Sequence, residues 1–320
     1  MNRRVFVTRE IPDSGLNILR ESGVDLEVHS NDHGISRGEL LKAVRNRDGV
    51  LCLLTDTIDE DVMIAASPKC QVFANCAVGY NNIDLTAARR LGIRITNTPG
   101  VLTESTSDMA WALLFCAARR VVESDTFMRS GQWQGWGPMQ FLGQDITGAT
   151  LGVVGAGRIG TDFALKSAGF RMRVLYTHPR ANLELEEKLG AVRMELPELL
   201  RLSDFVALHV PLKPETTHLI GDREFSLMKP TAILINTARG PVVDEKALVR
   251  ALSSRTIASA ALDVYENEPA TAAGLLELSN VVICPHIASA TTATRSRMAE
   301  MAALNLLAVF DGREPPNAVV

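Results

Sequence analysis

Three residues that can carry out acid–base and ionic chemistry, Arg239, Glu268 and His286, each follow an apolar run that predicts a β-strand. An arginine can hold a carboxylate through two parallel hydrogen bonds. A histidine can donate or accept a proton near neutral pH, and a carboxylate beside it stabilises its charged form. Hydride transfer to a 2-oxo acid needs a cation for the carboxylate, a proton donor for the developing alkoxide, and a group that keeps the donor protonated. A single arginine or histidine after a strand is more often structural, so this prediction depends on the three occurring together.

A glycine motif precedes these residues in the chain. Gly155, Gly157 and Gly160 have the G-x-G-x-x-G spacing, in which the glycines allow a tight turn, the approach of a pyrophosphate, and close packing of helix on strand. The triplet alone would also serve any tight strand-to-helix turn. Here it stands between a predicted strand at 149–154 and a predicted amphipathic helix at 162–168. We therefore predict that a dinucleotide phosphate binds at the N-terminus of this helix.

The turn at the end of the next predicted strand bears on the choice of cofactor. In this kind of fold a carboxylate about 20 residues beyond the glycines binds the ribose 2′-hydroxyl of NAD. This sequence has His178, Pro179 and Arg180 there and no acidic residue. A histidine and an arginine could bind a 2′-phosphate, although both could also be solvated turn residues. We expect NADP(H) to be preferred, with NAD(H) possible.

These residues must be positioned by parallel sheets, because short apolar runs alternate with helical patterns along the whole chain. The predicted class is α/β, with two doubly wound parallel-sheet domains (Rossmann- and flavodoxin-like) and a cleft between them. The predicted strands lie at 5–7, 26–29, 50–54, 72–77, 93–97, 149–154, 174–177, 205–210, 232–236, 258–264 and 281–284.

The segments between the two predicted sheets have their own patterns. A loop at 97–100 predicts the domain junction, and a helix should begin at Ser105 or Thr106 and end at Arg120. Ten successive apolar residues at 109–118 predict that this helix is buried on every side. Residues 129–144, with two tryptophans, predict an arm or long loop. A last helix is expected at 292–309, with Ser289 or Thr291 as its N-cap.

Composition narrows the function classes. The chain has 320 residues, 46% hydrophobic and 22% charged, with a net charge of −4, which argues against a nucleic-acid or membrane surface as partner. Its five cysteines are odd in number and form neither a C-x-x-C pair nor a zinc spacing, so we expect no metal site and a reducing, cytoplasmic location. The longest uncharged apolar run is too short to cross a bilayer.

Two turns in the first half follow apolar strands at the sheet edge where α/β proteins bind ligands. They contain Leu54 in the segment Leu53-Leu54-Thr55-Asp56, and Val78 and Gly79 in the segment Val78-Gly79-Tyr80-Asn81-Asn82. Both could be simple strand-to-helix turns. Gly79 would nevertheless let a small anion meet backbone N–H groups.

Five motifs, in order, make the chain similar to the D-isomer-specific 2-hydroxyacid dehydrogenase family over essentially its whole length. They are Val78-Gly79-Tyr80-Asn81-Asn82-Ile83-Asp84, Gly155-Ala156-Gly157-Arg158-Ile159-Gly160, Ile235-Asn236-Thr237-Ala238-Arg239-Gly240, Leu262-Asp263-Val264-Tyr265-Glu266-Asn267-Glu268-Pro269 and Pro285-His286-Ile287-Ala288-Ser289-Ala290-Thr291. The resemblance implies that Arg239, Glu268 and His286 are catalytic and that Leu54, Val78 and Gly79 bind substrate with Arg239 and His286. It also implies cofactor contacts at Thr106, Arg158, Ile159, Val210, Pro211, Thr216, Thr237, Ala238, Asp263 and Ala288, besides the glycines and the 178–180 turn.

The same resemblance implies a split chain. A substrate-binding domain would comprise residues 1–101 and 292–320, and a dinucleotide-binding domain residues 102–291. The helix after Val101 and the tryptophan-bearing arm would form a homodimer. Within the family the sequence is most similar to the glyoxylate/hydroxypyruvate reductases, although Gln140 stands where mammalian-like members carry a substrate-facing tryptophan.

The expected activity is reduction of glyoxylate or hydroxypyruvate to glycolate or D-glycerate. Other D-2-hydroxyacid dehydrogenases, acting on D-lactate, phosphoglycerate or a bulkier 2-oxo acid, are the nearest alternative. Formate oxidation does not need the proton-transfer pair of Glu268 and His286. A dinucleotide-sensing corepressor scaffold is the alternative from another class, and it would bind a partner peptide and turn over slowly.

Overall fold

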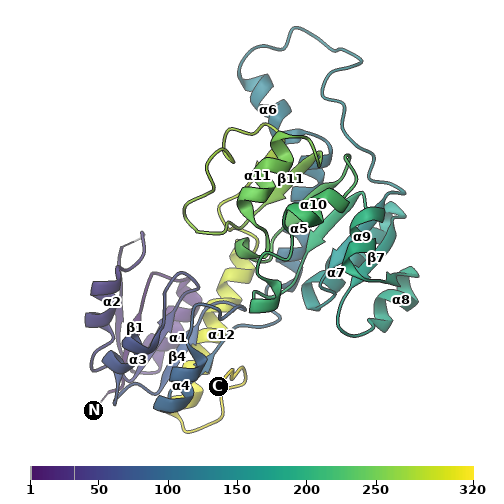
Figure 1. Ribbon diagram of the computed structural model, residues 1–320. Helices are drawn as coiled ribbons and strands as arrows, with labels where there is room; N and C mark the ends of the chain where they lie inside the picture. The colour runs from purple at the N-terminus through teal and green to yellow at the C-terminus, as the bar shows by residue number, and fades with distance from the viewer. Residues whose placement is uncertain (1, 32) are drawn as a thin grey trace. The chain divides into compact units, whose positions relative to one another are not determined.

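The structure is a computed structural model that describes residues 2–31 and 33–320. The chain forms two compact units, Met1–Leu102 with Ala290–Val320, and Thr103–Ser289 (Figure 1). The first unit is therefore built from both ends of the chain. Both units contain parallel β-sheets with helices between the strands, which confirms the predicted α/β class.

The first unit contains a parallel sheet in the order β2-β1-β3-β4-β5. This is the flavodoxin-like order, whose ligand-binding switch point lies between β1 and β3. Its helices and strands are β1 (Arg4–Val7), α1 (Asp13–Glu21), β2 (Asp25–Val28), α2 (Arg37–Ala43), β3 (Gly49–Cys52), α3 (Glu60–Ala66), β4 (Val72–Asn75), α4 (Leu85–Leu91), β5 (Arg94–Thr96) and α12 (Thr292–Phe310).

The last helix completes the core of this unit. α12 begins with Thr291 as its N-cap, whose side chain accepts a hydrogen bond from the Thr294 N–H at 3.1 Å. It packs against α1 so closely that a Cβ at Gly15 would lie 2.7 Å from Ala299. The C-terminal segment then lies beside β5, where Val319 N donates to the Ile95 carbonyl.

The second unit contains a parallel sheet in the order β12-β11-β10-β9-β6-β7-β8. β6, the strand before the glycine motif, lies between β7 and β9, so the glycine turn stands at the switch point of the sheet. The helices and strands are α5 (Thr103–Ala118), α6 (Val121–Arg129), β6 (Thr150–Val154), α7 (Arg158–Lys166), β7 (Arg173–Thr177), α8 (Leu183–Leu189), β8 (Val192–Arg193), α9 (Leu196–Leu202), β9 (Phe205–Leu208), α10 (Asp222–Leu227), β10 (Ile233–Asn236), α11 (Glu245–Ser253), β11 (Ser259–Leu262) and β12 (Val281–Ile283), with 3-10 turns at Ser167–Phe170, Pro214–Thr216 and Gly240–Val242.

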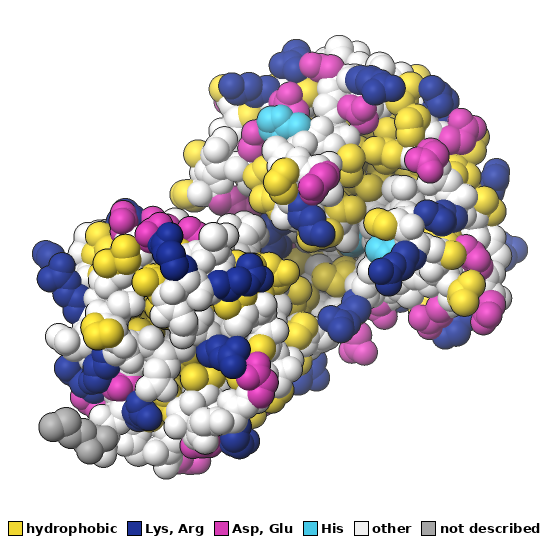
Figure 2. Space-filling view, turned by 60° about the horizontal axis from the view of Figure 1, so that its bottom comes forward, with side chains coloured by type: hydrophobic (Ala, Val, Ile, Leu, Met, Phe, Trp, Pro, Cys, Tyr) yellow, Lys and Arg dark blue, Asp and Glu magenta, His cyan; other side chains and the backbone are white. Residues whose placement is uncertain are grey.

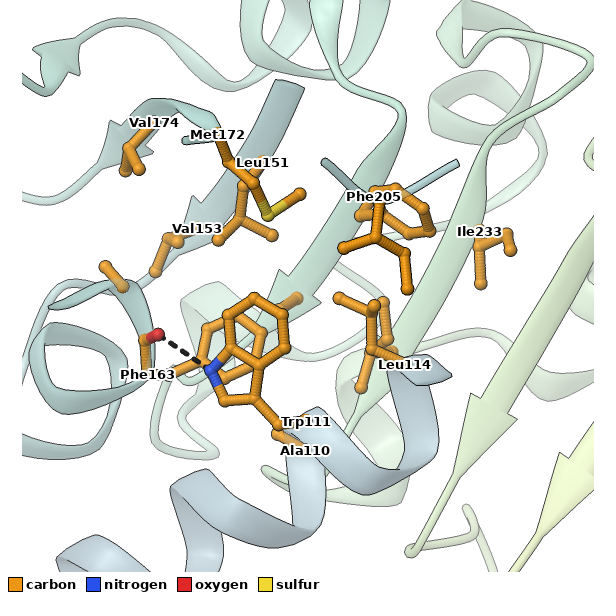
Figure 3. Close-up of a cluster of buried hydrophobic side chains, with 14 of the residues drawn as sticks. Ala110, Trp111, Leu114, Leu151, Val153, Phe163, Met172, Val174, Phe205 and Ile233 are labelled. Carbon is orange, nitrogen blue, oxygen red and sulfur yellow. Dashed lines mark hydrogen bonds between the residues drawn. The ribbon is translucent and has the colours of Figure 1, made fainter. Parts of the chain in front are cut away.

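Helix α5 packs one face of this sheet. Trp111 stacks on Phe163 of α7 with ring centroids 4.9 Å apart, and its Nε1–H donates to the Phe163 carbonyl at 3.0 Å (Figure 3). Around it lie side chains from the strands, including Leu151 and Phe205. Contrary to the prediction, the helix is not buried on every side in the single chain, because Ala112 is exposed and three further side chains of the apolar run are only partly buried.

The segment that follows α5 departs from its predicted pattern. Helix α6 covers residues for which the sequence predicts no helix, and the chain then runs without regular structure to β6 (Figure 1). Trp136 is 83% exposed and Met139 is 77% exposed in this segment, which we call the arm (residues 130–149). Two large apolar side chains of the arm therefore lie on the surface of the single chain.

Charge is distributed without large single-sign areas on the face drawn in Figure 2, where Lys and Arg side chains alternate with Asp and Glu side chains. Within the described ranges, none of the helices is both long enough and apolar enough to span a membrane.

Candidate active site

Arg239, Glu268 and His286 come from the loops that follow β10, β11 and β12. These strands are neighbours in one parallel sheet, so their carboxyl ends lie at the same edge. The structure brings Glu268 and His286 together: Glu268 Oε2 lies 2.8 Å from His286 Nδ1. Their side chains are 30% and 22% exposed, so the pair is shielded but still open to a small molecule.

The carboxylate of Glu268 accepts from two sides, because its Oε1 takes the Tyr265 N–H at 3.0 Å. Burial alone would raise the pKa of Glu268, but its hydrogen bonds with His286 and Tyr265, together with the charges of His286 and Arg239, lower the pKa below its usual value. The carboxylate is thus ionised and can only accept. It follows that His286 Nδ1 carries the hydrogen, which leaves Nε2 as the nitrogen that exchanges a proton with substrate.

Asp263 fixes the loop that carries His286 by accepting two of its backbone N–H groups. This carboxylate is fully buried, and its two oxygens accept the N–H groups of Ile287 at 2.8 Å and Ala288 at 2.7 Å. Burial raises the pKa of Asp263, and the two N–H bonds act in the opposite direction. His286 itself has a left-handed backbone with φ of 56°, a conformation that costs a residue with a side chain about 1 kcal/mol. The hydrogen bonds from Ile287 and Ala288 to Asp263 therefore stabilise a backbone conformation of His286 that is unfavourable by itself.

Arg239 follows a buried turn. Asn236, at the end of β10, donates through Nδ2 to the Arg239 carbonyl at 3.0 Å and accepts the Ala238 N–H through Oδ1 at 3.0 Å. One guanidinium nitrogen of Arg239 donates to the Ala238 carbonyl at 2.7 Å. Burial lowers the pKa of Arg239, and the nearby charge of Glu268 acts against that lowering. The Arg239 side chain is partly buried, and the charge of Glu268 acts on it.

The glycine turn is tight at two of its three glycines. Gly155 has φ of 98°, and a Cβ at Gly160 would lie 2.0 Å from the Gly155 carbonyl oxygen. A Cβ at Gly157 would meet no atom within 4 Å, and Gly157 gives helix α7 no side-chain cap. The first N–H groups of α7, beginning at Arg158, therefore have no helical partner, which is the arrangement of an anion-binding helix N-terminus.

Three other predicted cofactor contacts lie on three different segments of the second unit. Thr237 Oγ1 is buried and has no hydrogen-bond partner among the described residues, as expected of a group that meets a ligand. Thr216 Oγ1 donates to the Pro211 carbonyl at 2.7 Å and closes the loop after Val210. Thr106 lies on α5 and is 5% exposed.

The 178–180 turn has a basic neighbour that the sequence pattern does not predict. Arg193, on the two-residue strand β8, donates from Nε to the His178 carbonyl and from a terminal nitrogen to the Pro179 carbonyl, both at 2.9 Å. Its pairing with β7 places it there, with Tyr176 opposite Arg193. A strand of two residues has no pattern of its own, so only the pairing reveals this third basic residue.

The predicted substrate turns belong to the first unit. Asn97 Nδ2 donates to the Val78 carbonyl and Asn75 Nδ2 donates to the Gly79 carbonyl, both at 2.8 Å. Leu54 lies in the turn after β3, which Asp56 orders by accepting the Leu53 N–H at 2.7 Å. Both turns follow strand ends and are well defined.

This fold and site define an NAD(P)-binding oxidoreductase. The sequence profile described as "D-isomer specific 2-hydroxyacid dehydrogenase, NAD binding domain" matches residues 111–288. A glyoxylate reductase of Thermococcus onnurineus is 50% identical, with 100% of this chain and 96% of the relative aligned. The chain belongs to the D-isomer specific 2-hydroxyacid dehydrogenase family, as the sequence motifs had indicated.

Solved structures agree over the whole chain. The TT0316 protein from Thermus thermophilus superposes with a TM-score of 0.93 at 47% identity, covering 99% of this chain and 100% of that one. An NADPH-dependent glyoxylate/hydroxypyruvate reductase from Sinorhizobium meliloti, in complex with NADP and malonate, superposes with a TM-score of 0.87 at 31% identity, covering 100% and 97%.

Proposed function

We propose that this enzyme reduces glyoxylate and hydroxypyruvate to glycolate and D-glycerate. The observation that carries the proposal is the 2.8 Å pair of Glu268 and His286, with Arg239 on the neighbouring strand end. The relatives named glyoxylate reductase support the choice of substrate, because a curated one is 50% identical along the whole chain.

A dinucleotide held at the glycine turn of Gly155, Gly157 and Gly160 would supply the hydride that reduces the carbonyl carbon of the substrate. Arg239 holds the substrate carboxylate through its planar guanidinium. His286 gives the Nε2 proton to the carbonyl oxygen as that oxygen gains negative charge, and Glu268 stabilises the imidazolium before the transfer. In the oxidative direction neutral His286 takes the hydroxyl proton.

We also propose that NADPH is preferred over NADH. His178 and Arg180 belong to a turn without an acidic residue, and Arg193 is bonded to that turn; a basic turn of this kind suits a 2′-phosphate. NADP in a relative that is 31% identical supports this preference. In the same proposal Thr106, Ile159 and Ala288 also line the cofactor.

The first unit would bind substrate through Leu54, Val78 and Gly79, and the second unit would bind the dinucleotide.

The active form would be a homodimer. The same unit carries both the exposed arm and a cavity of about 690 Å³, which is lined by residues of α5, α6, the arm and the segment 276–282. In a two-fold dimer the arm of one protomer can pack into the cavity of its partner, and the reverse contact then forms as well.

The free thiols of all five cysteines suit a cytoplasmic enzyme.

Initial rates on a small panel of 2-oxo acids with NADH and NADPH test the proposal. Glyoxylate and hydroxypyruvate should give the highest kcat/KM, with NADPH. Faster turnover of pyruvate, phosphohydroxypyruvate or a bulkier acid would make another D-2-hydroxyacid dehydrogenase the better assignment. Dinucleotide binding without turnover of any acid would favour a scaffold.

A further inference from the structure

Glu245 is a buried carboxylate that has no part in the mechanism above. It is 4% exposed and is the first residue of α11. A carboxylate without hydrogen bonds would be costly in such a place. Its charge is compensated by backbone N–H groups and by the positive end of the α11 dipole.

The two oxygens of Glu245 bind the two ends of one loop segment. Oε2 accepts the Glu266 N–H at 2.7 Å, and Oε1 accepts the Ala272 N–H at 2.8 Å. Glu268 lies between these ends. One carboxylate therefore closes the segment 266–272 on which the partner of His286 stands.

The Glu266 side chain strengthens the same attachment. Its Oε2 accepts the Glu245 N–H at 3.2 Å, so the two residues exchange side-chain and backbone hydrogen bonds. Its Oε1 lies 2.7 Å from His218 Nε2. The segment is thus attached to α11 and to the loop after the 3-10 turn Pro214–Thr216.

We propose that Glu245 is a positioning residue for catalysis, which sets the place of the Glu268 carboxylate against His286. Glu245 makes no contact with the reacting atoms. The inference rests on the proposed function, since it concerns how well the Glu268–His286 pair transfers a proton. Loss of the attachment should impair the proton-transfer step and leave the cofactor turn unaffected.

The test compares Glu245→Gln with Asp244→Ala. Glutamine keeps one acceptor oxygen but places an amide nitrogen against one of the two N–H groups. Asp244 is the N-cap of the same helix and accepts the Ala247 N–H at 2.9 Å, with no bond to the segment 266–272. It therefore controls for a weakened α11.

We expect Glu245→Gln to lower kcat about tenfold to a hundredfold, a part of the 10²–10⁴ that a positioned acid–base group contributes. The Kd for NADPH should stay the same, and the pH–rate profile should change in the same direction as that of Glu268→Gln. Amide hydrogen exchange should rise in peptides that cover 265–272 and nowhere else. Asp244→Ala should keep the wild-type kcat and profile.

An unchanged kcat in Glu245→Gln, or equal losses in both variants with exchange raised throughout the unit, would overturn the inference. Failure of the wild type to reduce glyoxylate would overturn the proposed function instead. In that case exchange in 265–272 still decides whether Glu245 holds the segment, since this measurement needs no turnover.

Discussion

His286 Nδ1 and Glu268 Oε2 lie 2.8 Å apart although the residues stand on loops after different strands, β12 and β11. The ionised carboxylate directs the hydrogen of the imidazole to Nδ1, so Nε2 is left for substrate. One hydrogen bond thus orients the proposed acid and selects the ring nitrogen that is left for the substrate.

Replacement of His286 by alanine removes that acid. We expect kcat for glyoxylate to fall by about 10²–10⁴ while the Kd for NADPH stays nearly the same. Steady-state rates and fluorescence titration of NADPH measure the two quantities. His33→Ala, at an exposed position of the first unit, is the control and should leave kcat unchanged. Loss of NADPH binding in His286→Ala would assign His286 a structural role.

Arg239→Lys keeps the positive charge but removes the planar fork. We expect kcat/KM for glyoxylate to fall about tenfold to a hundredfold, the equivalent of a lost charge-assisted hydrogen bond of roughly 1.5–3 kcal/mol. Arg250→Lys serves as control, since Arg250 makes a two-point contact with Asp222 on the surface. Unchanged kinetics for Arg239→Lys would refute the carboxylate-binding role.

The cofactor turn can be tested by charge. His178→Asp should lower the ratio of kcat/KM for NADPH to that for NADH by roughly tenfold or more, because a carboxylate repels a 2′-phosphate. Arg193→Ala should lower the same ratio less, through loss of the bonds that hold the turn. Arg173→Ala, an exposed change at the other end of β7, should leave the ratio alone. A ratio that does not move in His178→Asp would remove the basis for NADPH preference.

His209 makes the second unit sensitive to acid. Its Nε2 is buried without a partner among the described residues, and burial lowers the pKa of His209 to about 3. The unfolded chain, with an ordinary histidine near 6.5, binds more protons between these values, so the free energy of unfolding falls as pH drops below about 6.5, by at most about 1.4 kcal/mol per pH unit. His209→Leu should flatten that fall.

Urea unfolding at pH 7, 6 and 5 measures this effect. His33→Leu, at an exposed position of the first unit, should show the wild-type dependence. Equal slopes for wild type and His209→Leu would mean that the histidine does not contribute.

The arm predicts the assembly. Met139→Asp places a charge on a side chain that is 77% exposed in the single chain, so the fold of the unit should be unaffected. We expect the wild type to be a dimer by light scattering and the variant to dissociate at micromolar concentration. A monomeric wild type, or an unaffected variant, would contradict the proposed interface.

Much of this fold could be predicted from the sequence, because apolar residues recur with different spacing in strands and in helices. The runs at 174–177 and 205–210 matched β7 and β9 within two residues. The misses have physical causes. β8 has two residues and exists only by pairing with β7, and α6 begins after Arg120, which has a left-handed conformation and gives no side-chain cap.

Part of the candidate site could also be predicted from the sequence. Glu268 and His286 stand next to strand ends, and parallel topology brings strand ends together. The bonds that orient them, from Asp263, Tyr265 and Glu245, involve backbone N–H groups. Such bonds depend on loop conformation, which side-chain types alone do not specify.

Asp263 has a consequence for how the sequence can change over time. It recognises the main chain of Ile287 and Ala288, not their side chains, and Ile287 is 39% exposed. The residue at 287 is therefore expected to drift freely among descendants of this protein without displacing His286. Replacement of Asp263 by a residue without a carboxylate would remove both of these hydrogen bonds, so we expect such a change not to be neutral.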